Sequence, residues 1–96
     1  MYAITATSYR AIASATDVLP GETAVDVIPA SLLTTLRGAE MRRQRDAMLA
    51  ACDWTQGADS PLDATTKAAW ATYRTALRNV PQQNGFPDTV NWPTQP

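Results

Sequence analysis

The chain has 96 residues, the length of one small domain, and 45% of them are apolar. Seventeen are alanine, which leaves 26 larger apolar side chains and predicts a thin hydrophobic core. The formal net charge is only −1, whereas disorder usually accompanies a strong net charge. We therefore expect a folded element that leans on a partner or on copies of itself.

Missing residue types exclude several functions. The chain has no histidine, which excludes Ser-His-Asp and Cys-His catalysis and any histidine-ligated metal. Cys52 is the only cysteine, so a disulfide within one chain and a multi-cysteine metal site are excluded as well. We expect no metal, cofactor or small-molecule substrate. The longest apolar run, 47–52, is too short for a membrane span, and without a secretory leader we expect a soluble protein of a reducing cytoplasm.

Residues 1–28 show the alternating pattern of short β-strands. Between two alternating stretches lies Asp17–Gly21, a turn in which Pro20 fixes φ and Gly21 can take a positive φ. The alternating apolar residues are Tyr2, Ile4, Ala6, Tyr9, Ala11, Val25 and Val27. We predict two or three short strands around this turn, as a hairpin or small sheet.

Residues 29–80 are predicted to form an antiparallel hairpin of two helices. The first covers 29–53, and Pro29 suits its first turn, where a missing N–H costs nothing. Leu, Met and Cys side chains follow at helical spacing. Gly38 costs about 1 kcal/mol relative to alanine inside a helix, so the helix either bends there or begins after it.

The second helix is predicted from about 62–64 to 79, with Ser60 or Asp63 as its N-cap. Its apolar face comprises Ala69, Trp70, Tyr73, Ala76, Leu77 and Val80. Pro81 ends it, and the prolines of 81–96 favour an extended C-terminal tail.

Charged clusters in the chain have simple structural explanations. Arg42, Arg43 and Arg45 suggest phosphate contacts on nucleic acid, but Glu40 and Asp46 stand close by. We therefore favour a solvated or ion-paired helix face. Acidic pairs suited to acid–base work all fall in turn or cap contexts; they are Asp17 with Glu22, Asp53 with Asp59, and Asp59 with Asp63.

The three tryptophans have different predicted roles. Trp70 lies on the apolar helix face and is expected in the core, and Trp54 ends the first helix and can pack back over the pair. Trp92 has no periodic element of its own. It either folds back over the helices or inserts into a partner, where aromatic anchors concentrate binding energy.

An ordered set of motifs runs through residues 42–96. They are Arg42-Arg43-x-Arg45-Asp46-x-x-Leu49-x-x-x-Asp53-Trp54, Trp70-x-x-Tyr73-Arg74-x-x-Leu77-Arg78-x-x-Pro81, Phe86-Pro87 and Trp92-Pro93. In this order they resemble the phage tail assembly chaperone family, small proteins associated with the tail fibres of tailed bacteriophages. The resemblance implies a role in building or completing tail fibres, without enzymatic chemistry.

We therefore expect an α+β protein with short N-terminal strands, a helical hairpin and an extended proline-rich tail. It would bind a tail-fibre or other tail protein in the host cytoplasm, as a homo-oligomer or part of a larger assembly. The residues expected to bind this partner are Trp54, Arg74, Arg78, Phe86, Trp92 and Pro93. Two alternatives stay open: a permanent structural subunit of the virion tail, and a small nucleic-acid-binding protein.

Overall fold

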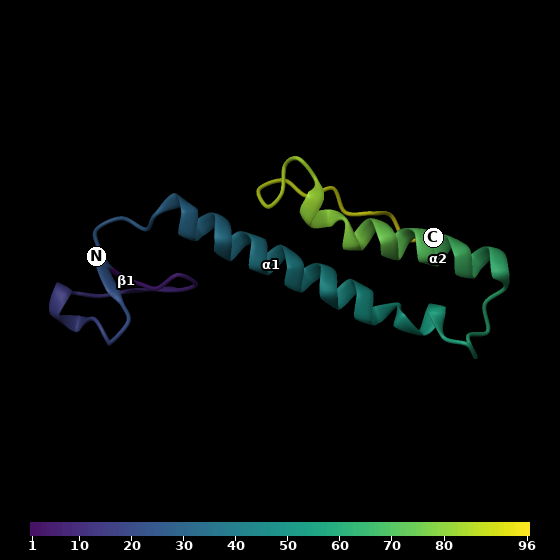
Figure 1. Ribbon diagram of the computed structural model, residues 1–96, viewed down its shortest axis with the longest axis horizontal. Helices are drawn as coiled ribbons and strands as arrows, with labels where there is room; N and C mark the ends of the chain where they lie inside the picture. Colours follow the sequence, from purple (N-terminus) through teal and green to yellow (C-terminus); the bar gives the residue numbers. More distant parts are fainter. The chain divides into compact units, whose positions relative to one another are not determined.

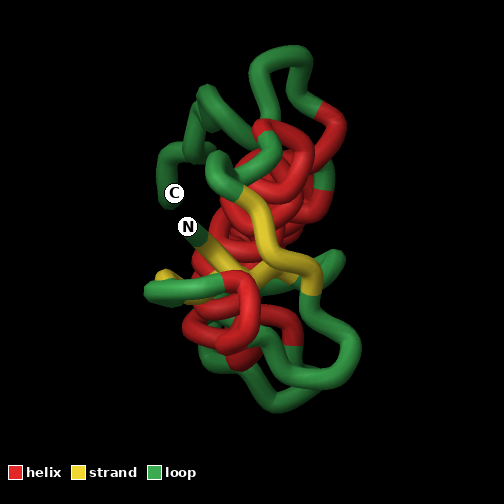
Figure 2. The backbone as a smooth tube through the Cα atoms, turned by 90° about the vertical axis from the view of Figure 1, so that its left-hand side faces the viewer, coloured by secondary structure: helices red, strands yellow, loops and turns green.

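The computed structural model describes residues 1–96 and divides them into two compact units, 1–37 and 38–96. The first contains a small β-sheet and the second contains paired helices, which confirms the α+β class predicted from the sequence (Figures 1 and 2). No helix in the chain combines the length and the apolar character needed to cross a bilayer.

Three strands of three residues each form the sheet in the first unit. They are β1 (Tyr2–Ile4), β2 (Tyr9–Ala11) and β3 (Thr23–Val25), in the order β2-β1-β3, with both neighbours antiparallel to β1. Ala3 lies opposite Arg10 on one side and Ala24 on the other. The connection between the last two strands contains a short 3-10 helix, η1 (Ala15–Asp17), and then a turn at Pro20 and Gly21, within the predicted turn segment 17–21.

Polar contacts hold the long β2–β3 connection in place. Arg10 donates from Nε and Nη2 to the two carboxylate oxygens of Glu22, at 3.0 and 2.7 Å. Its Nη2 also donates to the backbone carbonyl of Asp17 at 2.8 Å. Gly21 has a φ of +85°, a backbone conformation that glycine adopts without steric cost. The positive φ expected at this turn is therefore present.

Helix α1 (Ala30–Ala51) is continuous through Gly38. Pro29 stands immediately before it and accepts hydrogen bonds from the N–H groups of Leu32 and Leu33. The helix thus begins one residue after Pro29, its predicted first residue, and ends at Ala51, two residues before the predicted end at 53. It does not begin after the glycine, the alternative that the sequence had left open.

Helix α2 (Ala64–Arg78) runs back beside the second half of α1 (Figure 1). Between them lies the 3-10 helix η2 (Asp53–Gln56). Of the two predicted caps, Asp63 is the one used: its Oδ1 accepts from the backbone N–H of Thr66 at 2.7 Å. This hydrogen bond lowers the pKa of Asp63, as expected when a carboxylate satisfies an unpaired helix donor.

The segment after α2 differs from the extended tail that the sequence predicted. Val80–Gln82 form a third 3-10 helix, η3, and turns follow as far as Asp88, with a cis peptide bond between Phe86 and Pro87. Only residues 90–96 lack turns and helix. Proline excludes a helix interior but suits the first turn of a short 3-10 helix, where Pro81 lies.

Candidate partner-binding surface

A small aromatic and thiol core joins the two helices of the second unit. Cys52, Tyr73 and Leu77 are buried at its centre, and the four large side chains packed around them are Met48, Leu49, Trp70 and Trp92. Tyr73 and Leu77 come from the apolar face of α2 that the helical spacing predicted. Since the core is narrow, most of the helix surface stays exposed.

Arg74 is a buried cation at the edge of this core, with 8% of its surface exposed. Its Nη1 donates to the Leu49 carbonyl at 2.9 Å and to the Cys52 Sγ at 3.1 Å. Its Nη2 donates to Asp53 Oδ1 at 2.7 Å. The bond to Asp53, followed by the contact with Cys52, raises the pKa of Arg74 against the opposing effect of burial. Through these contacts the Arg74 guanidinium connects the end of α1 to α2.

Trp54 follows Asp53 in the sequence and lies on the surface. The next residue, Thr55, is fully buried, and its Oγ1 donates to the Cys52 carbonyl at 2.7 Å. With η2 held by Thr55 and Asp53, Trp54 is left 55% exposed. Its ring centroid is 6.4 Å from that of Trp70, and Trp70 meets Tyr73 edge-on at 5.7 Å. A row of three aromatic rings therefore leads from the core to solvent.

Phe86 packs on the helix at Gly38. A Cβ built on Gly38 would lie 3.6 Å from Phe86 Cε1, and the Arg42 guanidinium lies 5.1 Å from the centre of the Phe86 ring, within cation–π range. This contact was not foreseen, because it joins residues far apart in sequence. The one available signal was the glycine itself, since a glycine inside a helix often marks a close approach.

Trp92 folds back over the helices, one of the two alternatives that the sequence left open. It is half-buried against the core of Cys52, Tyr73 and Leu77. Pro93 is half-buried beside it and lines an open groove against α2. Near Trp92, the side-chain amide of Gln83 hydrogen-bonds both the N–H and the carbonyl of Asn91. The sequence offered no signal for Gln83.

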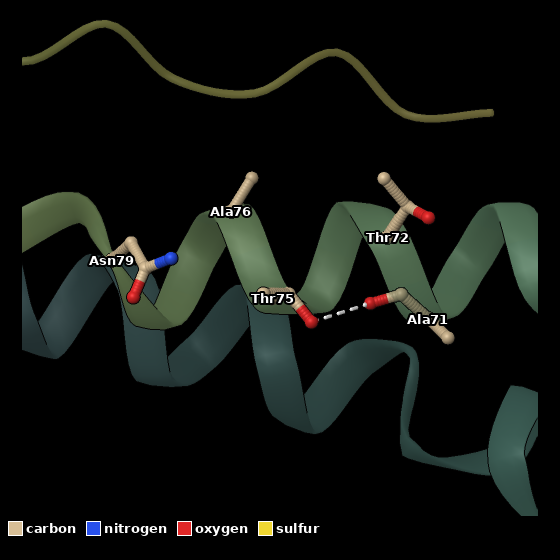
Figure 3. Close-up of a pocket in the computed structure, with 5 residues that line it drawn as sticks. All are labelled: Ala71, Thr72, Thr75, Ala76 and Asn79. Carbon is tan, nitrogen blue, oxygen red and sulfur yellow. Dashed lines mark hydrogen bonds between the residues drawn. The ribbon is translucent and has the colours of Figure 1, made fainter.

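Arg78 stands one turn after Arg74 in the last turn of α2, but it is exposed and makes no ion pair. A shallow depression of about 440 Å³ lies on the same helix, lined by Ala71, Thr72, Thr75, Ala76 and Asn79 (Figure 3). The Thr75 hydroxyl donates to the Ala71 carbonyl at 3.0 Å, so its hydrogen-bonding capacity is used within the helix. This side of α2 consists of small side chains.

The basic cluster of α1 is an ion-paired helix face, as predicted. Arg43 Nε donates to Glu40 Oε2 at 2.9 Å, and Arg45 Nε donates to Asp46 Oδ1 at 3.0 Å. The bonds from Arg43 and then Gln44 lower the pKa of Glu40. With Arg42 placed over Phe86, each arginine of the cluster already has a contact within the chain.

The acidic pairs are separated by other partners. Asp17 Oδ2 accepts from the Ser14 N–H at 3.0 Å in a capping box, whereas Glu22 binds Arg10. Asp53 binds Arg74 and Asp63 caps α2. These four carboxylates therefore have the turn, cap or ion-pair roles that explain their positions.

Comparison with known proteins identifies a protein family that matches the second unit. The family model of the phage tail assembly chaperone protein matches residues 38–96, the same residues that form the second compact unit. No curated protein and no solved structure matches the chain. Since the match covers more than half of the sequence and agrees with the motifs carried by the helices and the tail, the chain belongs to the phage tail assembly chaperone family.

Proposed function

We propose that this chain assists the assembly of a tail fibre by binding a fibre or other tail protein in the host cytoplasm. The observation that carries the proposal is the position of Trp54. It is the most exposed tryptophan, and it lies in the unit matched by the tail assembly chaperone family. A large aromatic side chain exposed at the surface is the kind of residue that concentrates binding energy in an interface.

The chemistry of this surface is binding alone. Trp54 supplies the apolar anchor, and Arg78 supplies an unpaired guanidinium for a partner carboxylate, which it can hold through two parallel hydrogen bonds. Arg74 acts from inside, because it fixes Asp53 and hence the 3-10 turn that presents Trp54. Phe86, Trp92 and Pro93 extend the surface along the C-terminal segment, where each is half-exposed.

Co-expression with the fibre protein of the same phage, followed by purification of the complex, tests the proposal. We expect Trp54→Ala to weaken binding by about 2 kcal/mol, or about thirtyfold in Kd, with an unchanged circular dichroism spectrum. Tyr9→Ala is the matched control, since Tyr9 is an exposed aromatic residue of the other unit. Wild-type affinity in the Trp54 variant would overturn the assignment of Trp54 to the binding surface. Failure of the wild-type chain to bind any tail protein would overturn the proposed function.

The first unit favours a second candidate, a permanent structural subunit of the tail. It exposes Tyr9, Leu19 and Val27 to 47%, 60% and 78%, and stable neighbours or further copies of the chain would cover such apolar side chains. The copy number in purified intact particles separates the two candidates. A chaperone is absent or substoichiometric there, whereas a structural subunit is present in a fixed ratio to the fibre.

A further inference from the structure

Residues 90–96, here called the C-terminal strap, are held to the second unit by few contacts. The last backbone–backbone hydrogen bond before the strap joins the Thr89 N–H to the Gly85 carbonyl at 2.9 Å. Beyond it the chain forms no helix, strand or turn. The strap nevertheless runs along α2 (Figures 1 and 3), so side-chain contacts keep it there.

One amide clamps the strap. Gln83 Nε2 donates to the Asn91 carbonyl, and Gln83 Oε1 accepts from the Asn91 N–H, both at 2.9 Å. The pair imitates the reciprocal bonding of two strand residues, but it is exposed to solvent. Each such bond contributes only about 1 kcal/mol to stability, because water replaces it when it opens.

The strap covers the core without filling the space beside it. Trp92 is its one large side chain and packs on the core formed by Cys52, Tyr73 and Leu77. Past Trp92, a groove of about 390 Å³ separates the strap from α2. Its lining consists of Ala69, Thr72, Tyr73, Ala76, Pro93, Thr94 and Pro96.

We propose that the strap is a displaceable cover, and that a partner protein takes its place on α2 with an extended segment that carries an aromatic residue followed by proline. This inference rests on the proposed function and names the segment of the partner. The surface of α2 and the core that the strap covers is here called the seat. It already holds a segment of this kind, since Trp92-Pro93 of the chain itself lies there. A segment of the same chemistry in a partner meets the same side chains, and the cost of making room for it is the small cost of opening the strap.

Amide exchange measured by NMR on the full chain tests whether the strap opens separately. We expect the Asn91 N–H to exchange at least tenfold faster than the Leu77 N–H, and Gln83→Ala to speed Asn91 exchange a further fivefold or more while Leu77 is unaffected. Gln82→Ala is the matched control, because Gln82 is the neighbouring amide, is exposed and does not bond the strap. Equal exchange of Asn91 and Leu77 in the wild-type chain would mean that the strap opens only on global unfolding, and would overturn the proposal.

A peptide of residues 88–96, added in trans, tests the seat. We expect it to shift the Trp92 indole signal of the full chain towards that of a free tail, at a concentration several times lower in Gln83→Ala. The same peptide with alanine in place of its tryptophan should have no effect. No shift at several millimolar peptide would overturn the proposal. Strap displacement in a concentration-dependent dimer without peptide would assign the seat to a second copy and also overturn it.

These experiments need no tail protein, so they separate the two proposals. A strap that never opens leaves the binding of a fibre through Trp54 untouched. A strap that opens and accepts the peptide, in a chain that binds no tail protein, would instead overturn the proposed function and leave the seat established.

Discussion

The two units of this chain are stabilised by different means. Residues 1–37 bury little more than Ala3 and Leu32, and the contacts of Arg10 with Glu22 and Asp17 hold their long connection. Residues 38–96 bury Cys52, Tyr73, Leu77 and Val80, and place a guanidinium at the edge of that core. Surface polar contacts thus stabilise the short sheet of the first unit, whereas burial stabilises the helical hairpin of the second.

This difference shows where the small number of large apolar side chains affects stability. Polar contacts at a surface contribute little, because solvent competes for them and salt screens them. Burial contributes about 25 cal/mol for each Å² of apolar surface, and the second unit holds most of the buried side chains. Variants that remove buried side chains of the second unit should therefore have the largest effects on stability.

Leu77→Ala is the largest expected effect. Leu77 is fully buried at the centre of the hairpin core, so removing three carbons costs transfer energy and leaves a cavity. We expect a loss of about 3 kcal/mol in the free energy of unfolding, measured by urea titration of the helical signal. Leu33→Ala, at a position 40% exposed on α1, is the control and should cost well under half as much. Equal losses would mean that the hairpin core is not where stability resides.

Arg74→Lys comes next. A lysine ammonium cannot reach the Leu49 carbonyl, the Cys52 sulfur and Asp53 together as the planar guanidinium does. Because buried acceptors are left without a donor, we expect a loss of about 2 kcal/mol by thermal or urea unfolding. Arg78→Lys, one turn further along α2 and exposed, should change stability by less than 0.5 kcal/mol on the scale of ordinary surface substitutions. A similar loss in both variants would contradict the internal role of Arg74.

Much of this architecture follows from local sequence signals. The start of α1 after Pro29, the cap at Asp63 and the positive φ at Gly21 each depend on one residue and its immediate neighbours. The ion-paired face of Arg43 and Glu40 follows from helical spacing in the same way. Such features are predictable because the chemistry that decides them lies within one turn.

The contacts that were not foreseen join residues distant in sequence. Phe86 packs on Gly38 and Gln83 clamps Asn91, and no periodic pattern links the members of either pair. The prolines after Val80 predict extended chain where the structure has turns, because proline density excludes a helix but does not distinguish a turn from a strand. The sequence also left the position of Trp92 open, because the residues that it packs against lie on other elements.

A fall in pH should act on the first unit through Glu22. Its bond with Arg10, then the N–H of Leu19, lowers the pKa of Glu22 below its ordinary value of 4.5. The carboxylate therefore stabilises the fold at neutral pH, and this contribution is lost as the pH falls below 4.5 and through the lowered pKa. We expect the Leu19 backbone N–H and the Arg10 Nε–H, which both donate to Glu22, to lose protection in that range, and Glu22→Gln to lack protection already at pH 7. An unchanged pH profile in the Glu22 variant would contradict this role.

Two glycine substitutions give the smallest effects and separate the units by sign. In the second unit, a Cβ on Gly38 meets the mobile end of Arg42 at 3.2 Å and the Phe86 ring at 3.6 Å. The guanidinium is exposed and can move by a few tenths of an ångström, so the higher helix propensity of alanine decides the outcome. We expect Gly38→Ala to raise the free energy of unfolding by up to about 1 kcal/mol.

In the first unit, a Cβ built on Gly21 would meet no other atom within 4 Å, but the φ of this residue is +85°, so alanine there is strained by the backbone alone. We expect Gly21→Ala to lower stability by about 1 kcal/mol, measured by thermal unfolding followed through the Tyr2 and Tyr9 resonances, whose rings meet edge-on at 6.2 Å. Opposite signs would show that glycine serves turn geometry in the sheet unit and is dispensable to the helix in the other. A destabilised Gly38→Ala variant would mean instead that the Phe86 ring and the Arg42 guanidinium cannot move aside, and that they pack on the helix too tightly to admit a Cβ.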